Sequence, residues 1–403
     1  MSRRIVARWD PADASSVPLL AEAGVEAVSA EAPGEAFARA CREAGIDLLA
    51  PGSLAFADAA SLDGAPPEKT LAFTGGVWPG LAAFDGMAGA SSGPWVDANL
   101  HWAGWLRALY PGRDAYLAHA PESGERILPY DSLELALVEA WVMGGNCLLA
   151  PPAALREGLL RDDARAREAW QRLGRTTRFL RRHEALFGQP VFPNLTVLVE
   201  AGEATAELAN LMHRRSLSPA LAPAADPPAP DPRILVLVAV DIAEPPPATG
   251  RRILDHARAG ATVVVNGKWW QATAGLSRLG EEEDRDILRL GRGKVAAYHD
   301  AIGDPGEFAY DVIDFVGQDR RAARLWNAAA AIGVASGNGT LCAVNYGRSM
   351  ERGGALARIS GRRRRARLLC PEAESTLLDP KPRGSGTEVE IPPWRRLAVV
   401  VFE

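Results

Sequence analysis

The sequence predicts an α/β protein in three parts: a compact (β/α)8 barrel, a three-layer α/β domain and a C-terminal antiparallel β-sandwich. In residues 1–188, short apolar segments alternate with helical segments that end at Gly or Pro, which is typical of parallel strands joined by helices. From about residue 291 the hydrophobic period becomes two, which is typical of antiparallel strands. The predicted domains are therefore residues 1–188, 189–290 and 291–403.

The composition fits this division. A chain of 403 residues is too long for one typical core, and its 47% hydrophobic and 24% charged content is that of an ordinary globular protein. The net charge of -5 argues against a dedicated nucleic-acid partner. The four cysteines are scattered without the spacing of a zinc site, so we expect reduced, mostly buried thiols and neither a metal nor a cofactor.

The distribution of apolar residues along the chain predicts its cellular location. No stretch reaches the roughly 20 apolar residues that span a bilayer. No apolar signal segment follows Met1-Ser2-Arg3-Arg4. If the chain starts here naturally, the expected location is cytoplasmic, with no membrane partner.

Strand and helix signals alternate along the first part. Extended segments are predicted at 5–10, 25–30, 46–50, 70–74, the start of 91–102, 114–119, 127–130 and 146–150. Helices are predicted at 15–23, 35–44, 100–109 and 131–143, with a charged helical region at 153–186. Residues 54–68 are expected to be a connection. Because a barrel of this kind usually needs about 200 residues, some crossover helices must be short or missing.

The later parts carry their own patterns. Strands at 195–199, 234–240 and 262–266, with helices at 205–216 and 250–259, predict an open parallel sheet. The sandwich strands are predicted at 294–298, 339–346, 355–360, 366–370, 387–391 and 397–402.

Acidic residues follow several predicted barrel strands, where such folds hold their chemistry. Hydrolysis by acid–base chemistry needs one carboxyl that donates a proton and one ionised carboxylate close to it. Asp97 and Glu122 come from adjacent βα units and are the predicted catalytic pair. The alternative is that Asp97 caps a helix and Glu122 is a solvated loop acid.

Further side chains near strand ends are predicted to bind substrate. Aromatic faces could stack on the rings of a substrate, and the polar groups could orient its hydroxyls or tune a carboxyl. For the two histidines in this set, the alternative of a purely structural role has at least the same weight as a role in binding. The predicted substrate-binding residues are Trp9, Asp10, Glu31, Trp78, Trp95, Asn99, His101 and His119.

The order of the three parts resembles a known family. A barrel is followed by an α/β segment at 234–267 and by sandwich segments at 325–347 and 368–392. This is similar to glycoside hydrolases of the β-galactosidase type, whose barrel precedes a glutamine-amidotransferase-like domain and a small β-sandwich. The resemblance implies a flavodoxin/amidotransferase-like middle domain, which in that family often mediates trimerisation. A homo-oligomer is therefore expected.

The chain departs from that family in two places. The family's barrel carries catalytic glutamates after its fourth and seventh strands, the first usually in an Asn-Glu pair, and no such pair occurs in this barrel. The middle domain has no cysteine, since none lies between Cys147 and Cys342, so it is expected to be catalytically silent. The sequence favours hydrolysis of a glycosidic bond. The alternative is a non-catalytic carbohydrate-binding or assembly protein with a degenerate barrel.

Overall fold

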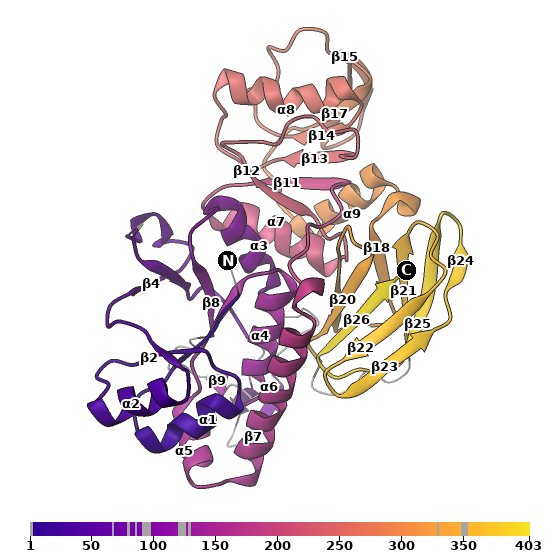
Figure 1. Ribbon diagram of the computed structural model, residues 1–403. Helices are drawn as coiled ribbons and strands as arrows, with labels where there is room; N and C mark the ends of the chain where they lie inside the picture. Colours follow the sequence, from indigo (N-terminus) through magenta and orange to yellow (C-terminus); the bar gives the residue numbers. More distant parts are fainter. Residues whose placement is uncertain are drawn as a thin grey trace.

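The computed structural model describes residues 3–66, 68–78, 81–84, 87–90, 98–119, 126–127, 130–328, 330–347 and 354–403. Within these ranges the chain forms a barrel, a middle α/β domain and a sandwich, which surround a shared centre (Figure 1). None of the helices in these ranges is long and apolar enough to cross a membrane. Cys41, Cys147, Cys342 and Cys370 are free thiols, and the first three are buried, as predicted.

The first unit is a curled parallel sheet of seven strands. Its order is β3-β2-β1-β10-β8-β5-β4, so β10 pairs with β1 and the strands follow one another in chain order around the sheet. The two end strands, β3 and β4, do not pair, which leaves an open seam. The strands are β1 (Ile5–Arg8), β2 (Ala27–Ser29), β3 (Asp47–Leu48), β4 (Leu54–Ala57), β5 (Thr70–Phe73), β8 (Ala115–His119) and β10 (Asn146–Leu149).

The inner face of this barrel is filled mainly by small residues. Val6, Ala27, Ala72, Ala118 and Leu148 belong to a separate inner core, while the alternate residues of the same strands face the helices. The helices of this unit are α1 (Val17–Glu22), α2 (Glu35–Glu43), α3 (Leu100–Leu109), α4 (Ser132–Val142), α5 (Ala153–Leu160) and α6 (Ala164–Arg182).

The predicted parallel barrel is confirmed, but two of its segments differ from the prediction. Residues 54–57 form strand β4, although the sequence indicated a connection there. The segment predicted at 127–130 is not a barrel strand, because β9 (Arg126–Ile127) pairs with β6 (Leu81–Phe84) in a small sheet that also holds β7 (Met87–Ala90). The predicted strand at the start of 91–102 lies outside the described residues.

The middle domain is a seven-stranded sheet with the order β12-β11-β13-β14-β17-β16-β15. Its first five strands are parallel and have the flavodoxin-like order 2-1-3-4-5. The strands are β11 (Leu195–Val199), β12 (Ala220–Pro223), β13 (Val236–Ala239), β14 (Thr262–Val265), β15 (Ser277–Glu281), β16 (Arg285–Leu290) and β17 (Gly293–Tyr298). The helices are α7 (Glu203–Arg214), α8 (Pro247–Ala259) and α9 (Pro305–Val316).

The predicted boundary at residue 290 was wrong. Lys294 pairs with Thr262 in parallel, so β17 is the fifth strand of the middle sheet and not a sandwich strand. Helix α9 follows β17 and packs against α7, which extends the middle domain to about residue 316. A short alternating strand does not reveal which sheet it joins, and this caused the error.

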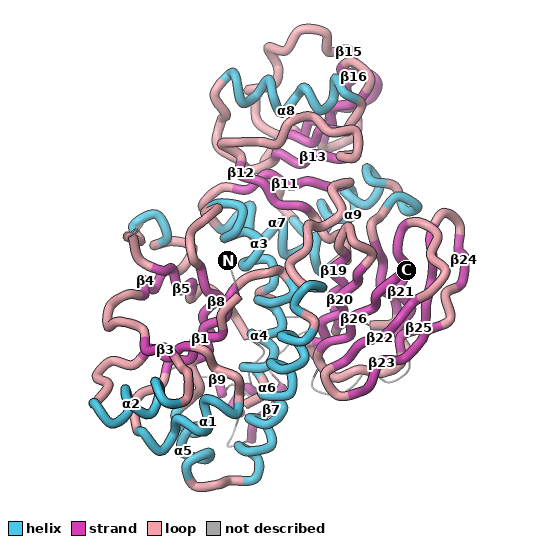
Figure 2. Tube along the Cα trace, in the orientation of Figure 1, coloured by secondary structure: helices cyan, strands magenta, loops and turns pink. Residues whose placement is uncertain are grey.

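The last unit is a sandwich of two antiparallel sheets, with the orders β18-β21-β25-β24 and β19-β20-β26-β22-β23 (Figure 2). Inward-facing residues such as Leu341, Ile359 and Val400 form the core between the sheets. The strands are β18 (Ala323–Trp326), β19 (Ala331–Ala335), β20 (Thr340–Asn345), β21 (Ala355–Ser360), β22 (Ala366–Cys370), β23 (Ala373–Leu378), β24 (Lys381–Arg383), β25 (Gly386–Ile391) and β26 (Leu397–Phe402).

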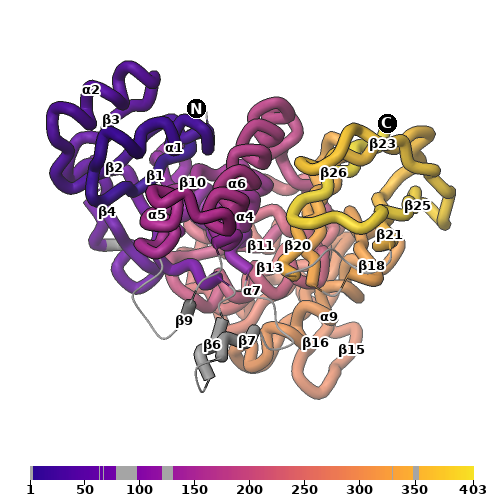
Figure 3. Tube along the Cα trace, turned by 90° about the horizontal axis from the view of Figure 1, so that it is seen from below, coloured from indigo at the N-terminus to yellow at the C-terminus, as the bar shows by residue number. Residues whose placement is uncertain are grey.

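Helices join the three units. α4 and α6 lie between the barrel and the sandwich, and α3 and α7 lie between the barrel and the middle domain (Figures 1 and 3). Every residue of α4 is buried, because the helix is covered by the barrel strands, α6 and strand β20. One hydrophobic core therefore runs through all three units, with Leu149, Val197 and Val399 among its members.

Candidate active site

Arg8 organises the described part of the barrel mouth. It ends β1 and stands two residues after Val6, so its side chain shares the inner face of the barrel. Its Nη2 donates to Glu31 Oε1 at 2.7 Å, and its Nε lies 3.4 Å from Asp10 Oδ2. Asp10 Oδ1 in turn accepts from the Glu31 backbone N–H at 2.8 Å. The predicted residues Asp10 and Glu31 are thus brought together, with Arg8 between them.

Phe56 lies under this charged group. Phe56 lies on β4 two residues after Leu54, so the two side chains share one face of the strand. Leu54 packs against the inner core, whereas Phe56 is 46% exposed. The Arg8 guanidinium carbon stands 5.7 Å from the Phe56 ring centroid. Since β1 and β4 are separated by β10, β8 and β5 in the sheet, this contact crosses the barrel. The mouth therefore presents an exposed aromatic ring beside a guanidinium and two carboxylates.

Two tryptophans predicted as sugar platforms belong to the core. Trp9 is 2% exposed and packs on Trp170 at 5.8 Å between ring centroids. It follows Arg8 directly and so points to the opposite, helix-covered face. Trp78 is 4% exposed and meets the ring of His119 edge-on at 4.9 Å. Neither indole can stack on a sugar in this structure, so both substrate-binding predictions are wrong.

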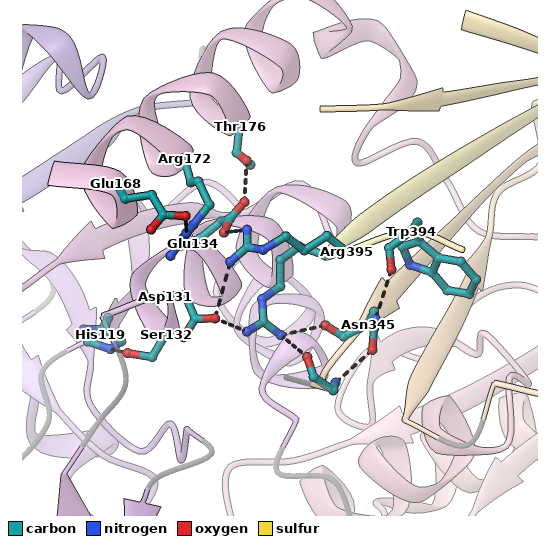
Figure 4. Close-up of polar contacts among 12 residues, drawn as sticks. His119, Asp131, Ser132, Glu134, Glu168, Arg172, Thr176, Asn345, Trp394 and Arg395 are labelled. Carbon is teal, nitrogen blue, oxygen red and sulfur yellow. Dashed lines mark hydrogen bonds and ion pairs between the residues drawn. The ribbon is translucent and has the colours of Figure 1, made fainter. Parts of the chain in front are cut away.

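His119 ends β8 and is completely buried. Its Nε2 lies 2.8 Å from Ser132 Oγ, at the start of α4, and its Nδ1 has no hydrogen-bond partner among the described residues (Figure 4). Burial lowers the pKa of His119 to about 4, so the ring is neutral at pH 7. Because Ser132 is also buried, this pair positions the β8 end and does not form an accessible nucleophile and base.

Asn99 ties three segments together. Its side chain accepts from the Val77 N–H at 2.6 Å and donates to the Val77 carbonyl at 2.8 Å. Its backbone N–H and Nδ2 both donate to the carboxylate of Glu139 on α4. Tyr346, just after β20, donates to the same carboxylate at 2.8 Å. Asn99 therefore ties Val77 to α4, and Glu139 extends this link to the sandwich through Tyr346, so the predicted contact of Asn99 with substrate is not supported.

Glu139 is a completely buried acid that was not among the site residues predicted from the sequence. Burial raises its pKa to about 7, although the hydrogen bonds from Asn99 and Tyr346 oppose that shift. A pair of glutamates in the otherwise apolar run of α4, Glu134 and Glu139, was the signal that could have found it.

His101 lies apart from the mouth. It is buried where α3 meets α7, and burial followed by the nearby His213 and Arg214 lowers its pKa well below the usual value. Burial likewise lowers the pKa of His213 to about 4. The predicted substrate contact of His101 is therefore wrong, because the side chain is sealed in the junction with the middle domain.

Asp97, Glu122 and Trp95 lie outside the described residues, but the segments that flank Asp97 and Glu122 are described. Asp97 stands two residues before Asn99, and Glu122 stands three residues after His119. Asn99 is bonded to Val77, and the next residue, Trp78, packs on His119. The two flanking segments are thus connected through residues 77–78.

An ion-pair network fixes the start of α4 beside the mouth. Arg395 donates to the buried Glu134 at 2.5 Å, and Arg396 donates to Asp131 at 2.6 Å (Figure 4). Thr176 on α6 also donates to Glu134, at 2.7 Å. Residues just before β26 of the sandwich therefore hold the helix that supports His119. Among the described residues no group of histidines, cysteines and carboxylates has the arrangement of a metal site.

Solved structures with the same arrangement of units match most of this chain. The chain matches an α-L-fucosidase, isoenzyme 2, from Paenibacillus thiaminolyticus with a TM-score of 0.54 at 8% identity, over 97% of this chain and 79% of that one. It matches the GH42 β-galactosidase Gan42B from G. stearothermophilus with a TM-score of 0.52 at 10% identity, over 92% of this chain and 66% of that one. This chain has the fold of a glycoside hydrolase of the β-galactosidase type.

The likeness concerns the fold. A β-galactosidase from Rahnella sp. R3 matches with a TM-score of 0.50 at 9% identity, over 91% of this chain and 66% of that one. The chain thus spans just under two thirds of the length of these two β-galactosidases. No protein-family model and no curated protein matches the sequence. This chain therefore shares the fold of these enzymes.

Proposed function

We propose that this protein binds a carbohydrate at the barrel mouth and hydrolyses a glycosidic bond there, with Asp97 and Glu122 as the two carboxyl groups. The observation that carries the proposal is the exposed ring of Phe56 beside Arg8, Asp10 and Glu31. An aromatic face covers the C–H face of a sugar, while a guanidinium donates to hydroxyl groups and carboxylates accept from them.

The charge of this group favours a neutral sugar. One guanidinium and two carboxylates carry a formal charge of -1, since Arg8 contributes +1 and Asp10 and Glu31 contribute -1 each. A sugar that carries a carboxylate or sulfate would meet repulsion, whereas a neutral sugar can exchange hydrogen bonds with all three side chains.

The chemistry would require one of Asp97 and Glu122 to donate a proton to the leaving oxygen. The other would act as nucleophile or activate water. The connection of their flanking segments through Val77 and Trp78 supports this pairing. Arg8, Asp10, Glu31 and Phe56 would orient the sugar and take no proton in the reaction.

A specific observation favours carbohydrate binding without hydrolysis as the second candidate. Strand β4, the fourth described barrel strand in chain order, is followed by Asp58, whose carboxylate is bonded to Ser61. That position does not hold the glutamate that the β-galactosidase type has after its fourth strand. A barrel without that glutamate would bind a sugar and leave it intact.

The deciding experiment is hydrolysis of neutral p-nitrophenyl glycosides, including a β-galactoside and an α-L-fucoside. We expect the wild-type chain to release p-nitrophenol, and Asp97→Asn and Glu122→Gln each to lower kcat by at least about 100-fold. Asp58→Asn, an acid outside the proposed pair, is the matched control and keeps its rate. Turnover that survives both substitutions contradicts the proposed pair. Sugar binding with no turnover in the wild type establishes the second candidate.

The expected homo-oligomer and the expected cytoplasmic location stay predictions. Sedimentation of the purified chain measures the first, and fractionation of the source cells measures the second.

A further inference from the structure

Two cavities lie at the opposite end of the barrel from the mouth. One, of about 400 Å³, lies between the ends of α3 and α4, residues 186–193, β12 and the sandwich. The other, of about 490 Å³, lies among residues that precede β8 and β10 and residues 110–114, which follow α3. Arg107, on the last turn of α3, lines both cavities. The two cavities therefore adjoin at this guanidinium.

The second cavity is rich in positive charge. It is lined by Arg3, Arg107 and Arg113, and the acid in its lining is Asp114. Each guanidinium donates to backbone carbonyls: Arg107 to Met143, Arg3 to Phe187, and Arg113 to Pro66. The lining of this cavity therefore holds three guanidinium groups and one carboxylate, and Glu184, which is not among its lining residues, offsets part of the charge of Arg3.

Two glycines bring two of these charges together. A Cβ on Gly144 would lie 2.6 Å from Arg107 Nη1 and 2.6 Å from the Cα of Gly188, and a Cβ on Gly188 would lie 3.0 Å from Arg3 Nη2. Arg3 and Arg107 therefore stand on either side of a backbone contact that only glycine permits. Burial lowers the pKa of Arg3, Glu184 opposes this shift, and Arg107 adds to it, as expected for like charges that are close together.

The first cavity is mainly apolar. Its walls include Met143, Leu186, Val191, Leu221 and Val334, which come from the barrel, the connection to the middle domain, the middle domain and the sandwich. A ligand here would contact all three units.

We propose that these two cavities bind one small organic anion. Its acidic group would lie in the second cavity, against the guanidinium groups of Arg3, Arg107 and Arg113 that line it, since guanidinium groups form charge-assisted hydrogen bonds with carboxylate or phosphate oxygens. Its apolar group would lie against Met143, Leu221 and Val334. Nothing in this site touches the barrel mouth, so the inference does not depend on the proposed hydrolysis.

The test is calorimetric titration of the full chain with phenyl phosphate and with inorganic phosphate. We expect phenyl phosphate to bind more tightly than inorganic phosphate, because only the former fills the apolar cavity. Arg107→Gln should weaken phenyl phosphate about tenfold or more, through loss of a charge-assisted contact. Leu221→Trp, which fills the apolar cavity, should weaken phenyl phosphate and spare inorganic phosphate.

Two controls locate the binding. Arg258→Gln removes an exposed guanidinium from the middle domain, and Arg8→Gln removes the one at the mouth. Both should leave the affinity unchanged. If Arg107→Gln fails to fold, Arg107→Lys together with Leu221→Trp decides the question. The proposal is overturned if millimolar phenyl phosphate does not bind the wild type, if Arg107 variants bind it equally well, or if Arg8→Gln abolishes binding.

Discussion

Buried titratable side chains set how the stability of this protein responds to pH. The pKa of His119 is about 4 in the folded chain, against an ordinary value of 6.5. Between these values the unfolded chain holds a proton that the folded chain excludes. Lowering the pH from 6.5 to 4 therefore removes about 3 kcal/mol of stability through this side chain.

We predict that His119→Phe makes the protein less sensitive to acid. Phenylalanine keeps the packing on Trp78 but cannot take up a proton. The difference in free energy of unfolding between pH 7 and pH 4.5, measured by urea denaturation, should shrink by about 2 to 3 kcal/mol. His299→Gln, at a half-exposed histidine, is the control. An unchanged difference in His119→Phe would show that the imidazole is not held neutral.

Glu139 makes the folded protein less stable as the pH rises, which is the opposite of the effect of His119. Its pKa is about 7 in the folded chain, against 4.5, so the folded chain keeps a proton that the unfolded chain has lost. Raising the pH from 4.5 to 7 therefore costs about 3 kcal/mol of stability. Glu139→Gln should be less stable than the wild type at pH 5, because its amide faces the donors of Asn99 and Tyr346. This gap should narrow by up to about 3 kcal/mol at pH 8. A gap that stays constant in urea denaturation contradicts the assignment.

Phe56 gives a residue-scale test of the mouth. Phe56→Ala should weaken binding of a neutral methyl glycoside about tenfold, because the sugar loses its aromatic contact. Stability should change little, since the ring is 46% exposed. Tyr310→Ala, at a ring 45% exposed on the middle domain, is the matched control for titration calorimetry. Equal affinities in the two variants would remove Phe56 from the site.

At the scale of elements, helix α4 depends on residues far along the chain. Glu134 is 2% exposed and is bonded to Arg395 and Thr176. Removing one partner of a buried pair leaves an uncompensated charge, so Arg395→Met should cost about 3 to 5 kcal/mol. The double variant Glu134→Leu with Arg395→Met should cost clearly less than the sum of the single variants, as measured by urea denaturation. Additive costs would show that the pair is not coupled.

The elements also show what sequence reasoning can reach. Strong apolar runs such as 195–199 and 397–402 are strands as predicted. Strand β4 was not predicted because Leu54-Ala55-Phe56-Ala57 lies among small residues. Phe56 was therefore not predicted as a residue of the barrel mouth. Trp9 and Trp78 were assigned to the mouth because a strand-end position does not show which face an aromatic side chain takes. Arg8 was detectable only as a charge two residues after Val6, on a face whose direction the fold decides.

At the scale of the whole molecule, one core links the three units. Val399 lies in the sandwich but packs in the core shared with the barrel and the middle domain. We predict a single transition in calorimetry, and Val399→Ala should shift the whole transition to lower temperature by destabilising the chain by about 2 kcal/mol. A separate sandwich transition that moves alone would contradict a shared core.

The central claim is that the barrel mouth binds a neutral sugar on Phe56, with Arg8, Asp10 and Glu31 at its hydroxyl groups. The most direct measurement is a crystal structure of the chain with the methyl glycoside that binds best in titration. We predict that sugar carbons lie within about 4.5 Å of the Phe56 ring and that hydroxyl groups bond to Asp10 and Glu31. A sugar bound elsewhere, with the ring of Phe56 left uncovered, would contradict the account.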